Sequence, residues 1–147
     1  MSDPSPTSSR PPFAIVAGFG IPGREVVNLL TARGVPFVVV ELNPLTVART
    51  VKGGLNIVHG DIATETALLA AGIDRATLLA LAVPDDVAVL RAVELARRLN
   101  PAVRILARCR RVSTAIEAAR RGADEVLSEE QLVGAEFARL AGPLLRG

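Results

Sequence analysis

Short apolar runs alternate with amphipathic stretches along nearly the whole chain. The apolar runs predict six β-strands, at residues 13–17, 35–40, 55–59, 77–83, 103–107 and 125–127. Between them, apolar residues recur at helical spacing, and glycine or Asn-Pro ends most of these stretches. A first helix is therefore expected to open at a glycine-rich turn and to end at Gly34, followed by helices over residues 44–52, 63–71, 86–99, 113–121 and 129–140.

Regular alternation of strand and helix predicts an α/β fold with right-handed crossover connections. We expect a Rossmann-type, doubly wound parallel sheet of six strands in the order 3-2-1-4-5-6, with a ligand crevice where strands 1 and 4 end. Residues 13–128 are predicted to form this single domain. Residues 1–12, rich in Ser, Pro and Thr, are expected to be a flexible leader, and residues 129–147 a C-terminal helix and tail.

The composition argues against several classes of protein. Half of the 147 residues are hydrophobic and 22% are charged, as in a globular domain. Four Phe and no Trp or Tyr leave few rings for base stacking, so no nucleic-acid partner is expected. One Cys and one His predict neither an internal disulfide nor a metal site, and they favour a reducing, cytoplasmic location. The apolar runs are far shorter than the roughly 20 residues that span a bilayer.

Basic residues are nearly all arginines, and they concentrate between Arg91 and Arg121 although the net charge is only +2. Two interpretations remain open. The cluster either contacts an anionic partner or forms a solvated helix face with charged strand ends.

The sequence Gly18-Phe-Gly-Ile-Pro-Gly23 lies between the first predicted strand and the first helix. In this position a glycine triplet allows a tight turn, close approach of the backbone to a pyrophosphate, and tight packing of helix on strand. The free amides of a helix N-terminus bind anions, and Pro22 suits a first turn because its missing N–H would be unpaired anyway.

An acid, Glu41, ends the second strand 23 residues after Gly18. A carboxylate here holds the ribose hydroxyls of an adenosine and repels a 2′-phosphate, which favours NAD(H), ATP, ADP or AMP over NADP(H). The alternative is that the glycines serve packing alone and Glu41 is an exposed charge.

Two further strand ends are expected at the same edge. Asp61 follows the third strand, where it either meets the adenosine or caps the next helix. Residues 83–86 follow the fourth strand, where the backbone and Asp85 either contact the ligand or, as the favoured role, Asp85 or Asp86 caps the next helix. The residues expected to contact the nucleotide, besides those three glycines, Glu41 and Asp61, are Phe19, Ile21, Pro22, Leu42, Ile62, Ala82 and Val83.

Beyond these residues, several segments resemble the regulator-of-potassium-conductance family, also called KTN or TrkA N-terminal domains. The resemblance covers roughly residues 13–140. Its distinctive segments are His59-Gly-Asp-Ile-Ala-Thr64, Leu68-Leu-Ala-Ala-Gly-Ile-Asp74, Val103-Arg-Ile-Leu-Ala-Arg-Cys109 and Arg121-Gly-Ala-Asp-Glu-Val-Leu-Ser128.

The resemblance implies a cytoplasmic domain that binds NAD(H) or another adenine nucleotide (AMP, ADP or ATP) and pairs into dimers or larger homo-oligomers. It also implies control of a separate membrane potassium channel or transporter, and so a place at the inner face of the membrane. Carried over by position, Gly18, Gly20 and Gly23 cradle phosphates, Glu41 holds the ribose and Asp61 lies by the adenosine. Arg108 is a phosphate or interface candidate. Many members have arginine after the second glycine, whereas this chain has Ile21.

An enzyme needs a proton-transfer or nucleophilic group facing the cofactor, and few are present. His59 is expected to be a structural strand-end residue, and Cys109 a buried thiol, although neighbouring arginines favour a lowered thiol pKa. We therefore expect a regulatory module, not an enzyme; the alternatives are a small NAD-dependent oxidoreductase or a nucleotide-sensing subunit of another complex. The apolar stripe of the last helix serves dimerisation or packs back on its own sheet, and the resemblance favours dimerisation.

Overall fold

The computed structural model describes residues 10–146, which form one six-stranded parallel sheet in the order β3-β2-β1-β4-β5-β6. The strands are β1 (Ala14–Ala17), β2 (Phe37–Glu41), β3 (Ile57–His59), β4 (Leu78–Leu81), β5 (Arg104–Cys109) and β6 (Glu125–Ser128). The helices are α1 (Ile21–Ala32), α2 (Pro44–Lys52), α3 (Glu65–Ala71), α4 (Asp86–Leu99), α5 (Val112–Arg121) and α6 (Glu129–Ala141), with a final 3-10 turn η1 (Gly142–Leu145). The doubly wound fold is confirmed.

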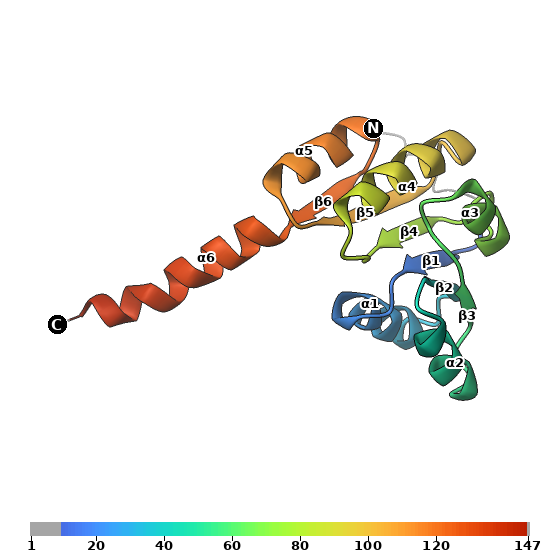
Figure 1. Cartoon of the computed structure of the whole chain (residues 1–147), viewed down its shortest axis with the longest axis horizontal. Helices are drawn as coiled ribbons and strands as arrows, with labels where there is room; N and C mark the ends of the chain where they lie inside the picture. The colour runs from blue at the N-terminus through green and yellow to red at the C-terminus, as the bar shows by residue number, and fades with distance from the viewer. Residues whose placement is uncertain (1–9, 147) are drawn as a thin grey trace, which may run out of the picture.

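The sheet separates two helical layers. Helices α1 and α2 pack on one face of the sheet, and α3, α4 and α5 cover the other (Figure 1). Side chains of β1 alternate between the layers: Ile15 and Ala17 join the core under α4, and Ala14 and Val16 join the core under α1. Burial on both faces explains why the central strands are continuous apolar runs.

Most of the predicted flexible leader, residues 1–9, lies outside the described residues. Its last part contacts the domain, because the Arg10 guanidinium donates to the Asp74 carbonyl at 2.9 Å.

Strand β5 is displaced from its predicted range of 103–107 and ends two residues later. Ile105, Ala107 and Cys109 point into the core, whereas Arg104, Leu106 and Arg108 alternate with them on the other face. On that face α1 and α2 cover β1, β2, β3 and β4. Within the described residues no helix covers the same face of β5 and β6, and Leu106 is 36% exposed. Arginine is tolerated in this strand because one of its faces meets solvent.

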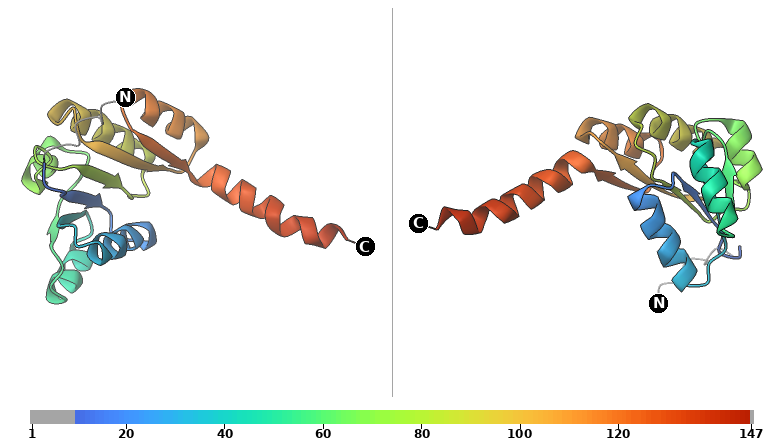
Figure 2. Two further views of the ribbon diagram at one scale, coloured as in Figure 1. Left: turned by 180° about the vertical axis from the view of Figure 1, so that it is seen from behind. Right: turned by 60° about the horizontal axis from the view of Figure 1, so that its bottom comes forward.

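Helix α6 projects away from the domain (Figures 1 and 2). None of its residues is buried, and among residues 10–146 most of its contacts are with β6, α5 and η1. Ser128 caps this helix, with its hydroxyl accepting from the Gln131 amide at 3.4 Å. Packing of this helix back onto its own sheet is therefore not what the structure shows.

Candidate functional site

The three glycines between β1 and α1 differ in what the fold requires of them. Gly18 has a φ of 94°, and a Cβ there would lie 3.1 Å from the Ala82 carbonyl carbon. At Gly23 a Cβ would lie 1.9 Å from the Gly18 oxygen, so α1 packs on β1 only with glycine at this position. Gly20 has extended geometry, and a Cβ built there meets nothing within 4 Å. Folding therefore explains Gly18 and Gly23, whereas it does not explain Gly20.

The start of α1 offers backbone donors. Gly20 is the N-cap and provides no side-chain cap, and Pro22 has no N–H. Within residues 10–146, no acceptor pairs with the amides of Gly20, Ile21 or Gly23. Unpaired amides at the positive end of a helix dipole are the donors that a phosphate group requires.

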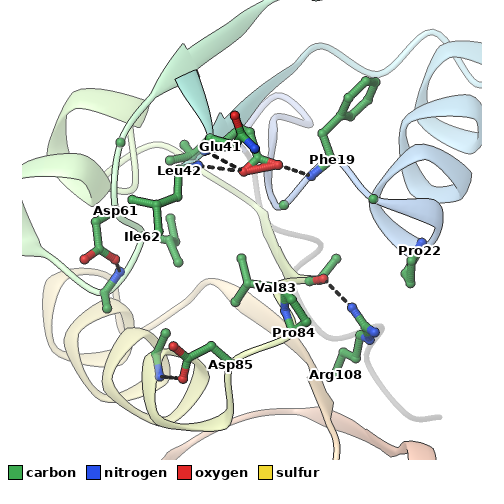
Figure 3. A pocket seen from close by; sticks show the side chains of 18 of the residues that line it. Phe19, Pro22, Glu41, Leu42, Asp61, Ile62, Val83, Pro84, Asp85 and Arg108 are labelled. Carbon is green, nitrogen blue, oxygen red and sulfur yellow. Dashed lines mark hydrogen bonds between the residues drawn. The ribbon is translucent and has the colours of Figure 1, made fainter. Parts of the chain in front are cut away.

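Glu41 is held firmly against this turn by backbone amides. One carboxylate oxygen accepts from the Phe19 amide at 3.2 Å, and the other accepts from Leu42 at 2.6 Å and Asn43 at 3.2 Å (Figure 3). A carboxylate has about four acceptor positions, so one remains for a ligand hydroxyl. Glu41 thus links the end of β2 to the glycine turn while it keeps some capacity to bind a sugar.

Asp61 lies on the opposite rim from the glycine turn, after β3. Its carboxylate accepts from the Ala63 amide at 2.9 Å. The alternative that it caps the next helix is wrong, because α3 begins at Glu65, later than the predicted residue 63, and Thr64 caps it by accepting from the Ala67 amide. Asp61 is thereby positioned by its own loop and lines the crevice.

The end of β4 forms the facing wall. Ala82 and Val83 lie against Gly18, and the Asp85 carboxylate caps α4 by accepting from the Ala88 amide at 3.1 Å, as predicted. Asp86, the other predicted cap, instead ties α4 to the loop after β5.

The Asp86 carboxylate accepts from the amides of Arg110 at 2.8 Å and Arg111 at 3.3 Å. Burial acts to raise the pKa of Asp86, but hydrogen bonds from Thr114 and these two amides outweigh it and hold the pKa below its usual value.

Arg108 reaches this wall from β5. Its Nη1 donates to the Ala82 carbonyl at 2.8 Å, and its Nε donates to the Glu129 carboxylate at 2.6 Å. In Figure 3 the Arg108 guanidinium lies between Val83 and the Pro22 end of α1. The arginine is thus half-buried and lines the crevice beside the end of β4.

These elements enclose one crevice of about 1330 Å³ at the carboxyl ends of the strands. All of the nucleotide contacts expected from the sequence line it except Gly23, which is buried between α1 and β1. Sequence reasoning missed several lining residues: Val40, Asn43, Pro44, Leu45, Gly60, Ala63, Pro84, Val87, Ala88 and Arg91. Arg91 was detectable in principle, since it lies three and four residues after Ala88 and Val87 and so shares their helix face.

A family model for the TrkA-N domain matches residues 14–129. The chain belongs to the TrkA-N domain family. This confirms the resemblance drawn from the segments around His59, Leu68, Val103 and Arg121. The match covers the whole sheet and ends at the first residue of α6.

Relatives of this TrkA-N domain occur in potassium transport proteins. It is 37% identical over 101 residues to the glutathione-regulated potassium-efflux system protein KefC of Cronobacter sakazakii. That alignment covers 69% of this chain and only 16% of the KefC protein.

Solved structures share its fold along nearly the whole chain. The TrkA-N domain of the Escherichia coli inner membrane protein ybaL matches with a TM-score of 0.80 and 25% identity, covering 91% of this chain and 98% of that one. The Kef CTD of Shewanella denitrificans in its AMP-bound form matches with a TM-score of 0.76 and 27% identity, covering 92% and 82% respectively.

The remaining candidate reactive groups of this TrkA-N domain lie outside the crevice lining. His59 Nε2 is 3.0 Å from the Leu42 carbonyl oxygen. Cys109 is fully buried, which confirms the expected buried thiol. Burial together with the charge of Asp86 raises its pKa to about 11, so the alternative of a pKa lowered by neighbouring arginines is wrong. The described residues contain no cluster of metal-binding side chains and no helix long and apolar enough to cross a membrane.

Proposed function

We propose that this TrkA-N domain binds an adenine nucleotide in the crevice and regulates a membrane potassium transporter or channel according to nucleotide occupancy. The observation that carries the proposal is the pairing of an open, fold-independent glycine, Gly20, with unpaired amides and a fixed acid, Glu41. The glycine and the unpaired amides suit a phosphate, and the acid beside them suits a ribose.

The ligand class follows from the charges around the site. Glu41 accepts from a ribose 2′-hydroxyl and repels a 2′-phosphate, so NAD(H), AMP, ADP and ATP fit and NADP(H) does not. The AMP-bound form of the related Kef CTD supports an adenine nucleotide ligand. We place NAD(H) first among the four, because the glycine turn has the spacing of a dinucleotide fingerprint and lacks an arginine after Gly20 for a terminal phosphate.

Calorimetric titration of the full chain with NADH, NADPH, AMP, ADP and ATP tests this proposal directly. We expect NADH to bind at least tenfold more tightly than NADPH, since a like-charge contact costs on the order of a few kcal/mol and about 1.4 kcal/mol already changes Kd tenfold. Glu41→Gln should reduce that preference, whereas Glu25→Gln, which removes an exposed charge on α1, should keep it. Equal binding of NADH and NADPH, or no binding of any nucleotide, refutes the assignment.

A regulatory role is favoured over an oxidoreductase by the chemistry of the lining. The described lining residues include no His, Cys, Lys, Tyr, Ser or Thr side chain. The carboxylates of Glu41, Asp61 and Asp85 all accept hydrogen bonds from backbone amides, so each of them already holds a turn, a loop or a helix start in place. Hydride transfer from bound NADH to an offered carbonyl substrate would instead support the enzyme alternative.

The partner is proposed to include a second copy of this chain. Helix α6 exposes Leu132, Val133, Phe137 and Leu140 on one side, with Phe137 73% exposed. The uncovered face of β5 and β6 exposes Leu106 and Leu127 as well. Because α6 projects from its own domain, these apolar surfaces do not meet within one copy, and a second copy brings them together.

Light scattering with a matched pair of variants tests this dimer. Phe137→Glu places a charge within the apolar stripe, and Ala138→Glu places the same charge on the far side of the helix. We expect the first to shift the chain toward monomer and the second to leave it dimeric. Identical masses for the two variants and the unmodified chain contradict the proposed surface.

In the cell, the dimer is proposed to be cytoplasmic and to reach the membrane through its transporter or channel partner.

A further inference from the structure

One side-chain ion pair joins the crevice to the N-terminal end of α6. Arg108 Nη2 lies 2.5 Å from a Glu129 carboxylate oxygen, and Nε of the same guanidinium donates to that oxygen. The two side chains are 24% and 32% exposed, so water screens the pair only in part. Glu129 is the first residue of α6, whereas Arg108 lines the crevice.

Few other hydrogen bonds hold the N-terminal end of α6. The Glu130 amide donates to the Arg110 carbonyl at 3.2 Å, and Ser128 supplies the cap. Within residues 10–146, the Arg108–Glu129 pair is the only ion pair between α6 and the sheet. This pair is therefore the one charged side-chain contact by which the described sheet holds the first residue of α6.

Arg108 also has donors to spare on the crevice side. A guanidinium carries five N–H groups, and the bonds to Ala82 and Glu129 leave at least two of them for another acceptor. Its position beside Ala82, which touches Gly18, brings those donors close to the unpaired amides of the turn. Arg24, the cation nearest the turn in sequence, is instead stacked over the Phe19 ring at 4.9 Å.

We propose that a bound nucleotide phosphate competes with Glu129 for Arg108, so that occupancy of the crevice weakens the attachment of the N-terminal end of α6 to the sheet. This inference rests on the proposed function, because it requires a phosphate at the glycine turn. Competition for one guanidinium makes the two events reciprocal: bound nucleotide weakens the Arg108–Glu129 pair by the same factor by which the pair weakens nucleotide binding. Glu129 is then a positioning residue that lowers affinity when the crevice is empty.

Nucleotide affinity of charge-neutral variants tests this reciprocity. Glu129→Gln removes the competitor and should tighten binding of AMP and NADH about three- to tenfold, the range for a half-exposed ion pair. Glu130→Gln removes the same charge one residue later and should change affinity less than twofold. A gain in affinity is a result that simple loss of structure does not produce. In an Arg108→Gln background, Glu129→Gln should give no further gain.

Hydrogen exchange gives a second readout. Nucleotide should accelerate exchange of the Glu130 and Gln131 amides in the unmodified chain, and Glu129→Gln should show that faster exchange without ligand. Unchanged affinity in Glu129→Gln overturns the competition while nucleotide binding stands. Absence of nucleotide binding to the unmodified chain overturns the proposed function and this inference together, so the two failures are distinguishable.

Discussion

Alanine at Gly20 is expected to weaken nucleotide binding without destabilising the fold. Two effects on stability oppose each other: restricting the unfolded chain contributes about 0.4–1 kcal/mol in favour of alanine, and the N-cap preference for glycine costs about 0.5–1 kcal/mol. The added Cβ meets nothing within 4 Å, so no packing penalty arises. The net change in the free energy of unfolding should stay within about 0.5 kcal/mol.

Affinity responds differently because the same methyl group occupies the space that a phosphate needs. Loss of one charge-assisted hydrogen bond from the turn costs about 1.5–3 kcal/mol, which corresponds to a Kd about 10- to 100-fold weaker. Gly23→Ala is the matched contrast. Its Cβ would lie 1.9 Å from the Gly18 oxygen, and relieving this overlap should cost about 3 kcal/mol or more of stability.

Urea unfolding and calorimetric titration of both variants separate the two roles. The expected pattern is a stable Gly20→Ala protein with weak binding and a destabilised Gly23→Ala protein. Gly20→Ala binding nucleotide as tightly as the unmodified chain would refute the phosphate assignment. Equal destabilisation by both substitutions would refute the distinction between a glycine for the ligand and a glycine for the fold.

Three other expectations concern the side chains of Asn100, Cys109 and Asp86. Asn100→Ala should lower the free energy of unfolding in urea by about 2–4 kcal/mol, because its amide donates to the buried Ile73 and Ala76 carbonyls at 2.8 and 3.0 Å; a cost under 1 kcal/mol contradicts this. Cys109, with a pKa of about 11 and no exposed surface, should react with a maleimide at pH 7.5 only as fast as the domain unfolds, and fast labelling of the folded domain would refute that. The pKa of Asp86 is lower in the folded than in the unfolded chain, so its contribution is complete above about pH 4 and is lost as pH falls through the folded value; Asp86→Asn should flatten the stability profile below that pH, and an unchanged profile would argue against it.

Local signals explain what the sequence predicts well. The tight turn after β1 and the acid at the end of β2 depend on residues within one strand-helix-strand unit, so spacing alone places them. The order of strands follows from connection lengths. The sequence does not fix the start of α3, because Asp61, Thr64 and Glu65 are all residue types that favour the beginning of a helix. Only the hydrogen bonds of the folded chain identify Thr64 as the cap.

Long-range contacts account for the rest. The end of β5 at Cys109 depends on pairing with β6, where Cys109 lies opposite Ser128, and strand propensity does not place arginine there. Arg108 and Glu129 are 21 residues apart, and no periodicity relates them. The sequence likewise does not predict that α6 projects away from the sheet, because an apolar stripe on a helix packs on its own sheet or on another molecule equally well.

The two halves of the crevice differ in how firmly they are held, and that difference gives the site a direction for transmitting binding. On the β1–β2 side, Glu41 is fixed by three backbone amides and the turn by two obligatory glycines, so little ordering is needed when a ligand binds there. On the β4–β5 side, Arg108 is held by one carbonyl and by a carboxylate on a helix that has no buried residue. A ligand that bridges both sides therefore finds a rigid partner and an exchangeable one. The structural response should appear on the exchangeable side, because the rigid side has no alternative set of hydrogen bonds to adopt.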